Sequence, residues 1–156
     1  MKKVRWNGSF YAIEMPSCHL VFRTAYEPVI IIYDYKFPDK ASIDTSLIKN
    51  VSPILFLPVH KSLFSDRRVT FLSYLEFSAD DMVLVPPQFW QDVVDQNNCK
   101  LLYADGSVKE VMPQECIGIE PIGAYDSDHV LSRIESFFKG EPNAYYELVK
   151  VKVPQQ

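Results

Sequence analysis

An α+β fold with mostly antiparallel strands is predicted by three features of the sequence. Short apolar or alternating segments recur at hairpin spacing, and aromatic residues reach 13% of the 156 residues. One amphipathic segment near the end of the chain has the length and the capping residues of a helix. We therefore expect a strongly curved sheet or partial barrel with one C-terminal helix, formed by residues 1–156 as a single domain.

The predicted strands of the first half follow one another through short turns. Residues 8–14 and 18–24 form a hairpin, because both segments alternate and a proline separates them. Residues 29–35 carry β-branched side chains on both faces, which is typical of a buried central strand. Residues 53–59 lie between two prolines, which indicates an edge strand, and residues 67–77 form the longest alternating strand.

The second half of the chain is less regular. Residues 80–95 are predicted to form a loop, with one helical turn over 88–92 after a pair of prolines. The dipeptide Asp105-Gly106 lies between two apolar segments and is the strongest hairpin signal in the chain. Residues 145–153 alternate in polarity, and we expect them to form the last strand.

The one long helix is predicted over residues 128–139. Asp126 and Asp128 are candidates for its N-cap, and Gly140 suits the position just after its end. Its apolar stripe has helical spacing and consists of Val130, Leu131, Ile134, Phe137 and Phe138.

Charge, cysteine usage and hydropathy argue against several classes of partner. The chain has 16 Lys and Arg against 20 Asp and Glu, so it lacks the basic surface of a nucleic-acid-binding protein. Cys18, Cys99 and Cys116 are odd in number and far apart, which favours reduced thiols over a disulfide framework. The longest apolar runs are too short to cross a bilayer. We expect a cytoplasmic protein without a nucleic-acid or membrane partner.

The sequence contains no recognisable catalytic, cofactor-binding or metal-binding motif, and we expect a protein that is not an enzyme. The three histidines do not lie at metal-ligand spacing, and the five glycines form no phosphate-binding loop. Cys116 and His129 are the closest approach to a nucleophile and its base. An acidic neighbour, Glu115, and an apolar segment should raise the pKa of the Cys116 thiol, which favours a packed core cysteine.

A family resemblance extends over most of the chain. It is carried by the segments 8–13, 29–34, 86–89, 112–120, 129–134 and 140–143, of which Pro113-Gln114-Glu115-Cys116-Ile117-Gly118-Ile119-Glu120 is the most specific. With these segments the chain resembles small bacterial immunity proteins of polymorphic toxin systems. The resemblance implies a cytoplasmic antidote that binds a cognate toxin. It also implies structural roles for Pro113 at a turn, for Gly118 at a close approach or an unusual dihedral angle, and for Arg133 as the partner of Glu120.

Under this reading an acidic surface would attract a basic toxin. The candidate partner-binding residues are Asp80, Asp81, Trp90, Glu115, Asp126 and Asp128. Trp90 either anchors the partner or plugs one end of the sheet.

Two other classes of function stay open. The first is a small-ligand or carbohydrate-binding barrel, with or without enzymatic activity, and the second is a subunit of a larger assembly. Five tyrosines would either line the pocket of such a barrel or fill the core: Tyr11, Tyr33, Tyr35, Tyr74 and Tyr103. The oligomeric state stays open as well.

Overall fold

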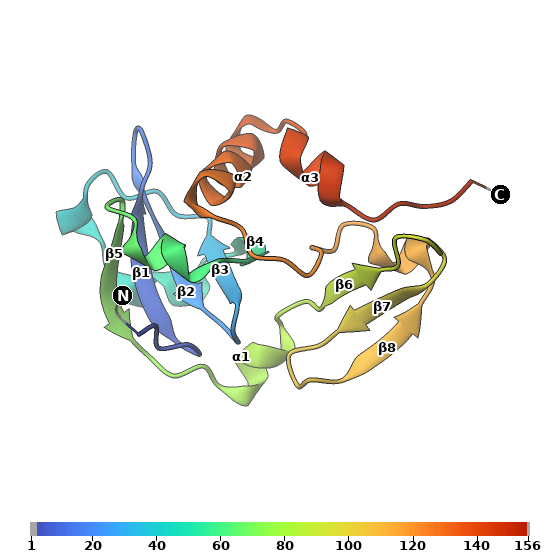
Figure 1. Cartoon of the computed structure of the whole chain (residues 1–156). Coiled ribbons are helices and arrows are strands. Elements are labelled where there is room, and N and C mark those ends of the chain that lie inside the picture. The colour runs from blue at the N-terminus through green and yellow to red at the C-terminus, as the bar shows by residue number, and fades with distance from the viewer. Residues whose placement is uncertain (1–2, 156) are drawn as a thin grey trace.

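The computed structural model describes residues 3–155 and has two antiparallel sheets with one long helix (Figure 1). Residues 1, 2 and 156 of the predicted domain lie outside the described residues. The large sheet contains, in spatial order, β4 (Pro53–Pro58), β3 (Val29–Tyr33), β2 (His19–Thr24), β1 (Ser9–Glu14) and β5 (Val69–Tyr74). The small sheet contains β6 (Gln88–Gln91), β7 (Cys99–Leu102) and β8 (Val108–Val111). The α+β class with mostly antiparallel strands is therefore confirmed.

Several of the predicted strands have the expected positions. The β1–β2 hairpin is present, β3 is buried on both faces, and β4 with its two prolines lies at a sheet edge. Asp105-Gly106 joins β7 to β8. Within residues 3–155 the large sheet is open, because β4 and β5 are its two edges and do not pair with each other. The predicted partial barrel is thus not confirmed.

The predicted long helix is confirmed as α2 (Ser127–Lys139). The carboxylate of Asp126 accepts a hydrogen bond from the His129 N–H at 3.0 Å, and Gly140 ends the helix with a φ of 66°. The apolar side of α2 packs on one face of the large sheet, where it forms the main core with residues of β1 to β4. The shorter helices are α1 (Ala79–Val83) and α3 (Ala144–Val149), and the 3₁₀ turns are η1 (Lys40–Ser42), η2 (Thr45–Asn50), η3 (Lys61–Ser65) and η4 (Pro113–Cys116).

Three predictions in the second half are wrong. The expected last strand over 145–153 begins instead with the helix α3, because the Asn143 side chain caps it by accepting from the Tyr146 N–H at 3.0 Å. The expected helical turn over 88–92 is the strand β6, which pairs along its whole length with β7. The expected loop over 80–95 contains β6 and most of α1, whose first turn is capped by Ser78.

The second face of the large sheet is covered by two separate segments. Around η2, Phe37, Ile43 and Ile48 pack over Phe10 and Val21. Beyond β5, residues 77–85 including α1 pack over Ala25, Val29 and Ile31. The central part of this face lies between the two coverings.

A bridging segment, residues 117–125, connects the two sheets (Figure 1). At one end the Phe89 N–H of β6 donates to the Glu120 carbonyl at 3.0 Å. At the other end the Tyr125 N–H donates to the Pro58 carbonyl of β4 at 2.9 Å. No helix in the described part of the chain has the length and apolarity needed to cross a membrane.

Candidate functional site

The predicted acidic residues do not form one surface. Asp80 and Asp81 lie in α1, which packs on one face of the large sheet, whereas Asp126 and Asp128 begin α2 on the opposite face (Figure 1). Glu115 lies in η4, which packs with the small sheet. Any single partner surface can therefore include only some of these residues.

Most of these carboxylates have a local role at the start of a helix or turn. Asp81 and Ser78 cap α1 reciprocally, and Asp126 caps α2. The Glu115 carboxylate accepts from the Met112 N–H at 2.8 Å, and Asp128 lies 3.5 Å from the Arg68 guanidinium. These contacts explain the positions of four of the acidic residues without a partner protein, because acidic groups are favoured in the first turn of a helix: Asp81, Glu115, Asp126 and Asp128.

Trp90 lies on a strand and not in the loop that the sequence predicts. Its neighbours Phe89 and Leu101 point into the core of the small sheet, so Trp90 and its cross-strand partner Lys100 occupy the other face. The Lys100 ammonium lies 5.5 Å from the centre of the Trp90 ring, and the tryptophan is 39% exposed. Trp90 is thus available on the surface of the small sheet.

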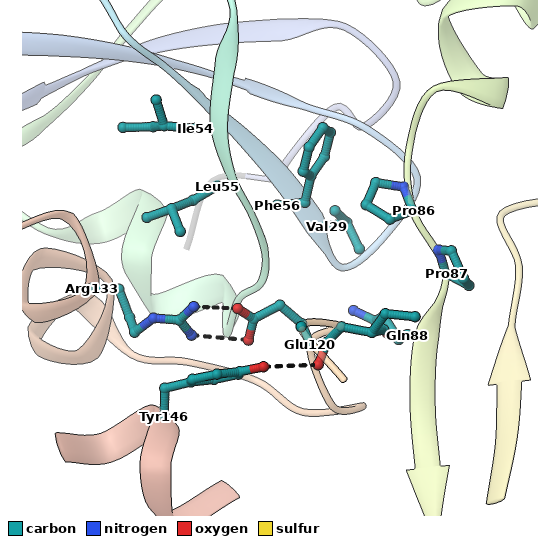
Figure 2. Close-up of a pocket in the computed structure, with 12 residues that line it drawn as sticks. Val29, Ile54, Leu55, Phe56, Pro86, Pro87, Gln88, Glu120, Arg133 and Tyr146 are labelled. Atoms are coloured by element: carbon teal, nitrogen blue, oxygen red, sulfur yellow. Dashed lines mark hydrogen bonds and ion pairs between the residues drawn. The ribbon is translucent and has the colours of Figure 1, made fainter. Parts of the chain in front are cut away.

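Glu120, the last residue of the most specific motif, forms a buried joint between the bridging segment and α2. Figure 2 shows the Arg133 guanidinium and the Glu120 carboxylate facing each other with two hydrogen bonds, one of which is 2.9 Å long. The Tyr125 hydroxyl donates to the same carboxylate at 2.9 Å, and the Arg133 guanidinium carbon lies 4.5 Å from the centre of the Tyr146 ring. The expected Arg133–Glu120 pair is therefore confirmed, as are the turn at Pro113 and the positive φ of Gly118, 80°.

This joint lines a cavity of about 240 Å³ between the sheets (Figure 2). Arg133 and Glu120 lie on one side, and Pro86, Pro87 and Gln88 lie on the other. Because the ion pair is bidentate and receives a third hydrogen bond, its charges are satisfied within the protein. The arrangement suits a structural connection better than a reactive site.

A larger cleft of about 740 Å³ opens on the second face of the large sheet, between η2 and the α1 segment. The register of the sheet places one residue from each strand in a single row, and all five line this cleft: Ser73, Phe10, Arg23, Ile31 and Phe56. We call it the Arg23 cleft. It lies over the centre of the sheet, where the two covering segments leave the face uncovered.

Arg23 is the central polar group of this cleft and is only 8% exposed. Its guanidinium carbon lies 4.8 Å from the centre of the Phe10 ring and 4.3 Å from that of Phe77. One terminal nitrogen donates to the carbonyls of Leu75 and Glu76, while the buried Nε has no hydrogen-bond partner within residues 3–155. In the same range Arg23 forms no ion pair. A buried cation with an unused donor is costly unless a ligand supplies the missing partner.

The other polar groups of the cleft lie around Arg23. Burial raises the pKa of the Tyr33 phenol, and the nearby Arg23 charge acts in the opposite sense. Lys49, Glu76 and Asp81 also line the cleft, together with apolar side chains of η2 and the α1 segment. Of the five tyrosines considered for a pocket, Tyr33 lines the Arg23 cleft, whereas Tyr11 packs in the core of the opposite face.

The residues considered for nucleophilic or metal chemistry are not brought together. Cys116 is buried beside the small sheet with a pKa raised to about 11 by burial, to which Cys99 and Glu115 add. His129 instead stacks on Tyr145 at 3.8 Å between ring centres. In residues 3–155 no cluster of histidine, cysteine and acidic side chains is arranged to hold a metal ion.

Sequence reasoning did not single out Arg23, although one signal was present. Arg23 shares a strand face with Val21, so a charged residue occupies an inward position of an otherwise apolar strand. A charge at such a position requires a partner or a role. Comparison of the chain with protein-family models, curated proteins and solved structures gave no match.

Proposed function

We propose that this protein is a non-catalytic cytoplasmic inhibitor of the immunity type, which binds a cognate bacterial toxin and blocks it. The Arg23 cleft is the observation that supports a binding role. Arginine and aromatic side chains in a pocket are typical of the residues that dominate protein interfaces. The cleft combines Arg23 with Phe10, Phe56 and Phe77.

The rim of the cleft supports a protein partner. Leu75 and Leu84 line the cleft and are 52% and 75% exposed. Large apolar side chains that surround a polar anchor become buried when a partner covers them. The class of the partner, a toxin, follows from the family resemblance of the sequence.

The two acidic groups then have different expected roles. Asp81 lines the cleft and Asp80 is its neighbour in α1, so this group would face a basic toxin at the same surface. Asp80→Lys should slow association and flatten its dependence on salt. Asp128→Lys, on the opposite side of the sheet, is the matched control and should change neither.

Capture of the tagged protein from its host, followed by an inhibition assay on the captured toxin domain, tests the proposal. Wild-type protein should neutralise the toxin at equimolar ratio, and Leu84→Asp should weaken neutralisation by tenfold or more, about the effect of an interface residue worth 1.4 kcal/mol. Leu148→Asp in α3 is the control, because Leu148 is 74% exposed but does not line the cleft. Equal neutralisation by both variants would place the interface elsewhere, and the absence of any toxin among the partners would contradict the immunity role.

A small-ligand-binding domain is the second candidate. The volume of the Arg23 cleft, about 740 Å³, lies in the range of small-molecule sites, which combine apolar walls with a few polar groups. This candidate predicts that Leu84→Asp leaves ligand affinity nearly unchanged, because a small ligand would not need to cover the rim.

A further inference from the structure

We infer that the group that enters the Arg23 cleft is a carboxylate carried on an apolar body, supplied by an acidic residue of the partner protein. Resting on the proposed function, this inference adds the chemistry that the cleft recognises. Three observations support it: the contacts of the Arg23 guanidinium, the charged residues that line the cleft, and the exposed leucines at its rim.

The guanidinium of Arg23 can receive a ligand only at its edge. Phe10 and Phe77 lie within 5 Å of its carbon, which restricts access to its faces. One terminal nitrogen is already used by the carbonyls of Leu75 and Glu76. A carboxylate oxygen can accept a charge-assisted hydrogen bond from the other terminal nitrogen, Nη1.

Two cations, Arg23 and Lys49, and two carboxylates, Glu76 and Asp81, line the cleft, and of the four only Arg23 is buried. Arg23 is buried and forms no ion pair in the described chain, so a carboxylate would neutralise it. Glu76 and Asp81 line the same cleft and would repel a doubly charged phosphate more strongly than a carboxylate. Around these charges the walls are apolar, with Ile31 and Val85 among them.

The exposed rim favours a protein over a free acid as the source of the carboxylate. A small acid that fills the cleft would leave Leu75 and Leu84 in water, whereas a protein segment would cover them. Asp80 and Asp81 beside the rim suit a cationic residue next to the inserted carboxylate. The expected segment therefore combines one acidic residue with apolar and basic neighbours.

A comparison of two matched probes tests the recognised chemistry without relying on a variant. Backbone amide resonances of the wild-type protein are followed while 3-phenylpropionate or its amide, 3-phenylpropanamide, is added. We expect the acid to shift resonances of residues that line the cleft and to bind at least tenfold more tightly than the amide, since the neutral amide cannot form a charge-assisted hydrogen bond with Arg23. Equal affinities, or shifts confined to other surfaces, would overturn the inference.

Variants then locate the effect and identify the source. Arg23→Gln should lower the affinity for 3-phenylpropionate about tenfold or more, while Arg5→Gln, which removes an arginine stacked on Tyr74 outside the cleft, should leave it unchanged. Competition between 3-phenylpropionate and the toxin would support a carboxylate from the partner, and simultaneous binding of both would overturn that source. If the protein neutralises the toxin but its cleft binds the acid and the amide equally, this inference is refuted and the proposed function is not. Acid selectivity without any toxin would refute only the proposed function.

Discussion

Two arginines are buried in the described part of the chain, and their surroundings differ. Arg133 faces the Glu120 carboxylate with two hydrogen bonds and belongs to the joint between α2 and the bridging segment. Arg23 has carbonyl acceptors for one nitrogen and aromatic rings nearby, but it forms no ion pair with a carboxylate of residues 3–155. The first is satisfied within the fold, whereas the second has binding capacity left. Burial alone therefore does not distinguish a structural charge from a functional one.

Removing the carboxylate from the buried pair should destabilise the protein strongly. Glu120→Ala leaves Arg133 buried without its partner, which costs about 3–5 kcal/mol in comparable pairs. Glu147→Ala is the matched control, because Glu147 pairs with Lys150 on the surface and such pairs are worth about 0.2–1 kcal/mol. Urea unfolding measures both losses, and similar losses for the two variants would contradict a structural role of the joint.

The thiols should differ in reactivity in the folded protein. Cys99 and Cys116 are buried, and burial raises the pKa of both, which lowers the fraction of reactive thiolate. Only the half-buried Cys18 should react with a thiol reagent at mildly alkaline pH before the protein unfolds. Native Cys18→Ser should show no fast phase, and two thiols should react after addition of concentrated guanidinium chloride. A fast phase in native Cys18→Ser would show that Cys99 or Cys116 is accessible.

Helices and strands were predicted correctly where the signal lies within a few consecutive residues. The Asp105-Gly106 turn, the prolines of β4 and the caps of α2 are each contained in a few consecutive residues. The prediction for residues 88–91 failed because these four residues form the strand β6 only through pairing with β7. The prediction of a strand over residues 145–153 failed because the spacing of Tyr145 and Val149 fits one face of a helix as well as one face of a strand. The Asn143 cap favours the helix α3.

The same limit applies to the candidate site. The row that contains Arg23 requires the register of five strands, one of which, β5, follows β4 in sequence but lies at the opposite edge of the sheet. No local pattern specifies such a long-range arrangement. Alternation along the strand puts Arg23 on the face of Val21, but only the register places Phe10 and Ile31 beside it.

Gly8, immediately before β1, should be sensitive to any side chain. Its φ is 142°, and an added Cβ would lie 2.1 Å from the Leu75 carbonyl oxygen, which also accepts a hydrogen bond from Arg23. We expect Gly8→Ala to destabilise the protein by at least about 1–3 kcal/mol and to shift the Leu75 and Arg23 resonances. Gly123→Ala is the control, because the nearest atom to its added Cβ is 3.9 Å away. Unchanged cleft resonances in Gly8→Ala would contradict this coupling.

At the scale of the whole molecule, the two sheets have separate apolar cores. The main core lies between the large sheet and α2, and a smaller core lies beside β6, β7 and β8. They are connected by the bridging segment and by the Glu120–Arg133 joint, and the Gln91 side chain exchanges two hydrogen bonds with the backbone of Lys152, which follows α3. Cooperation between the sheets therefore depends on a few polar contacts more than on a shared core.

The two tryptophans allow this dependence to be measured, since Trp6 packs on Phe64 beside the main core and Trp90 lies on the small sheet. Trp90→Phe leaves Trp6, whose fluorescence reports unfolding of the large sheet. Trp6→Phe leaves Trp90, whose fluorescence reports unfolding of the small sheet. We expect equal urea midpoints, since a single domain unfolds in one transition. Adding Glu120→Gln to each variant should separate the midpoints, with the small sheet unfolding first because its core is smaller, whereas Glu147→Gln should not. Unequal midpoints in the variants that keep Glu120 would mean that the two sheets are independent domains. The Arg23 cleft lies wholly on the large sheet and its covering segments, so it would then require only the folded large-sheet domain.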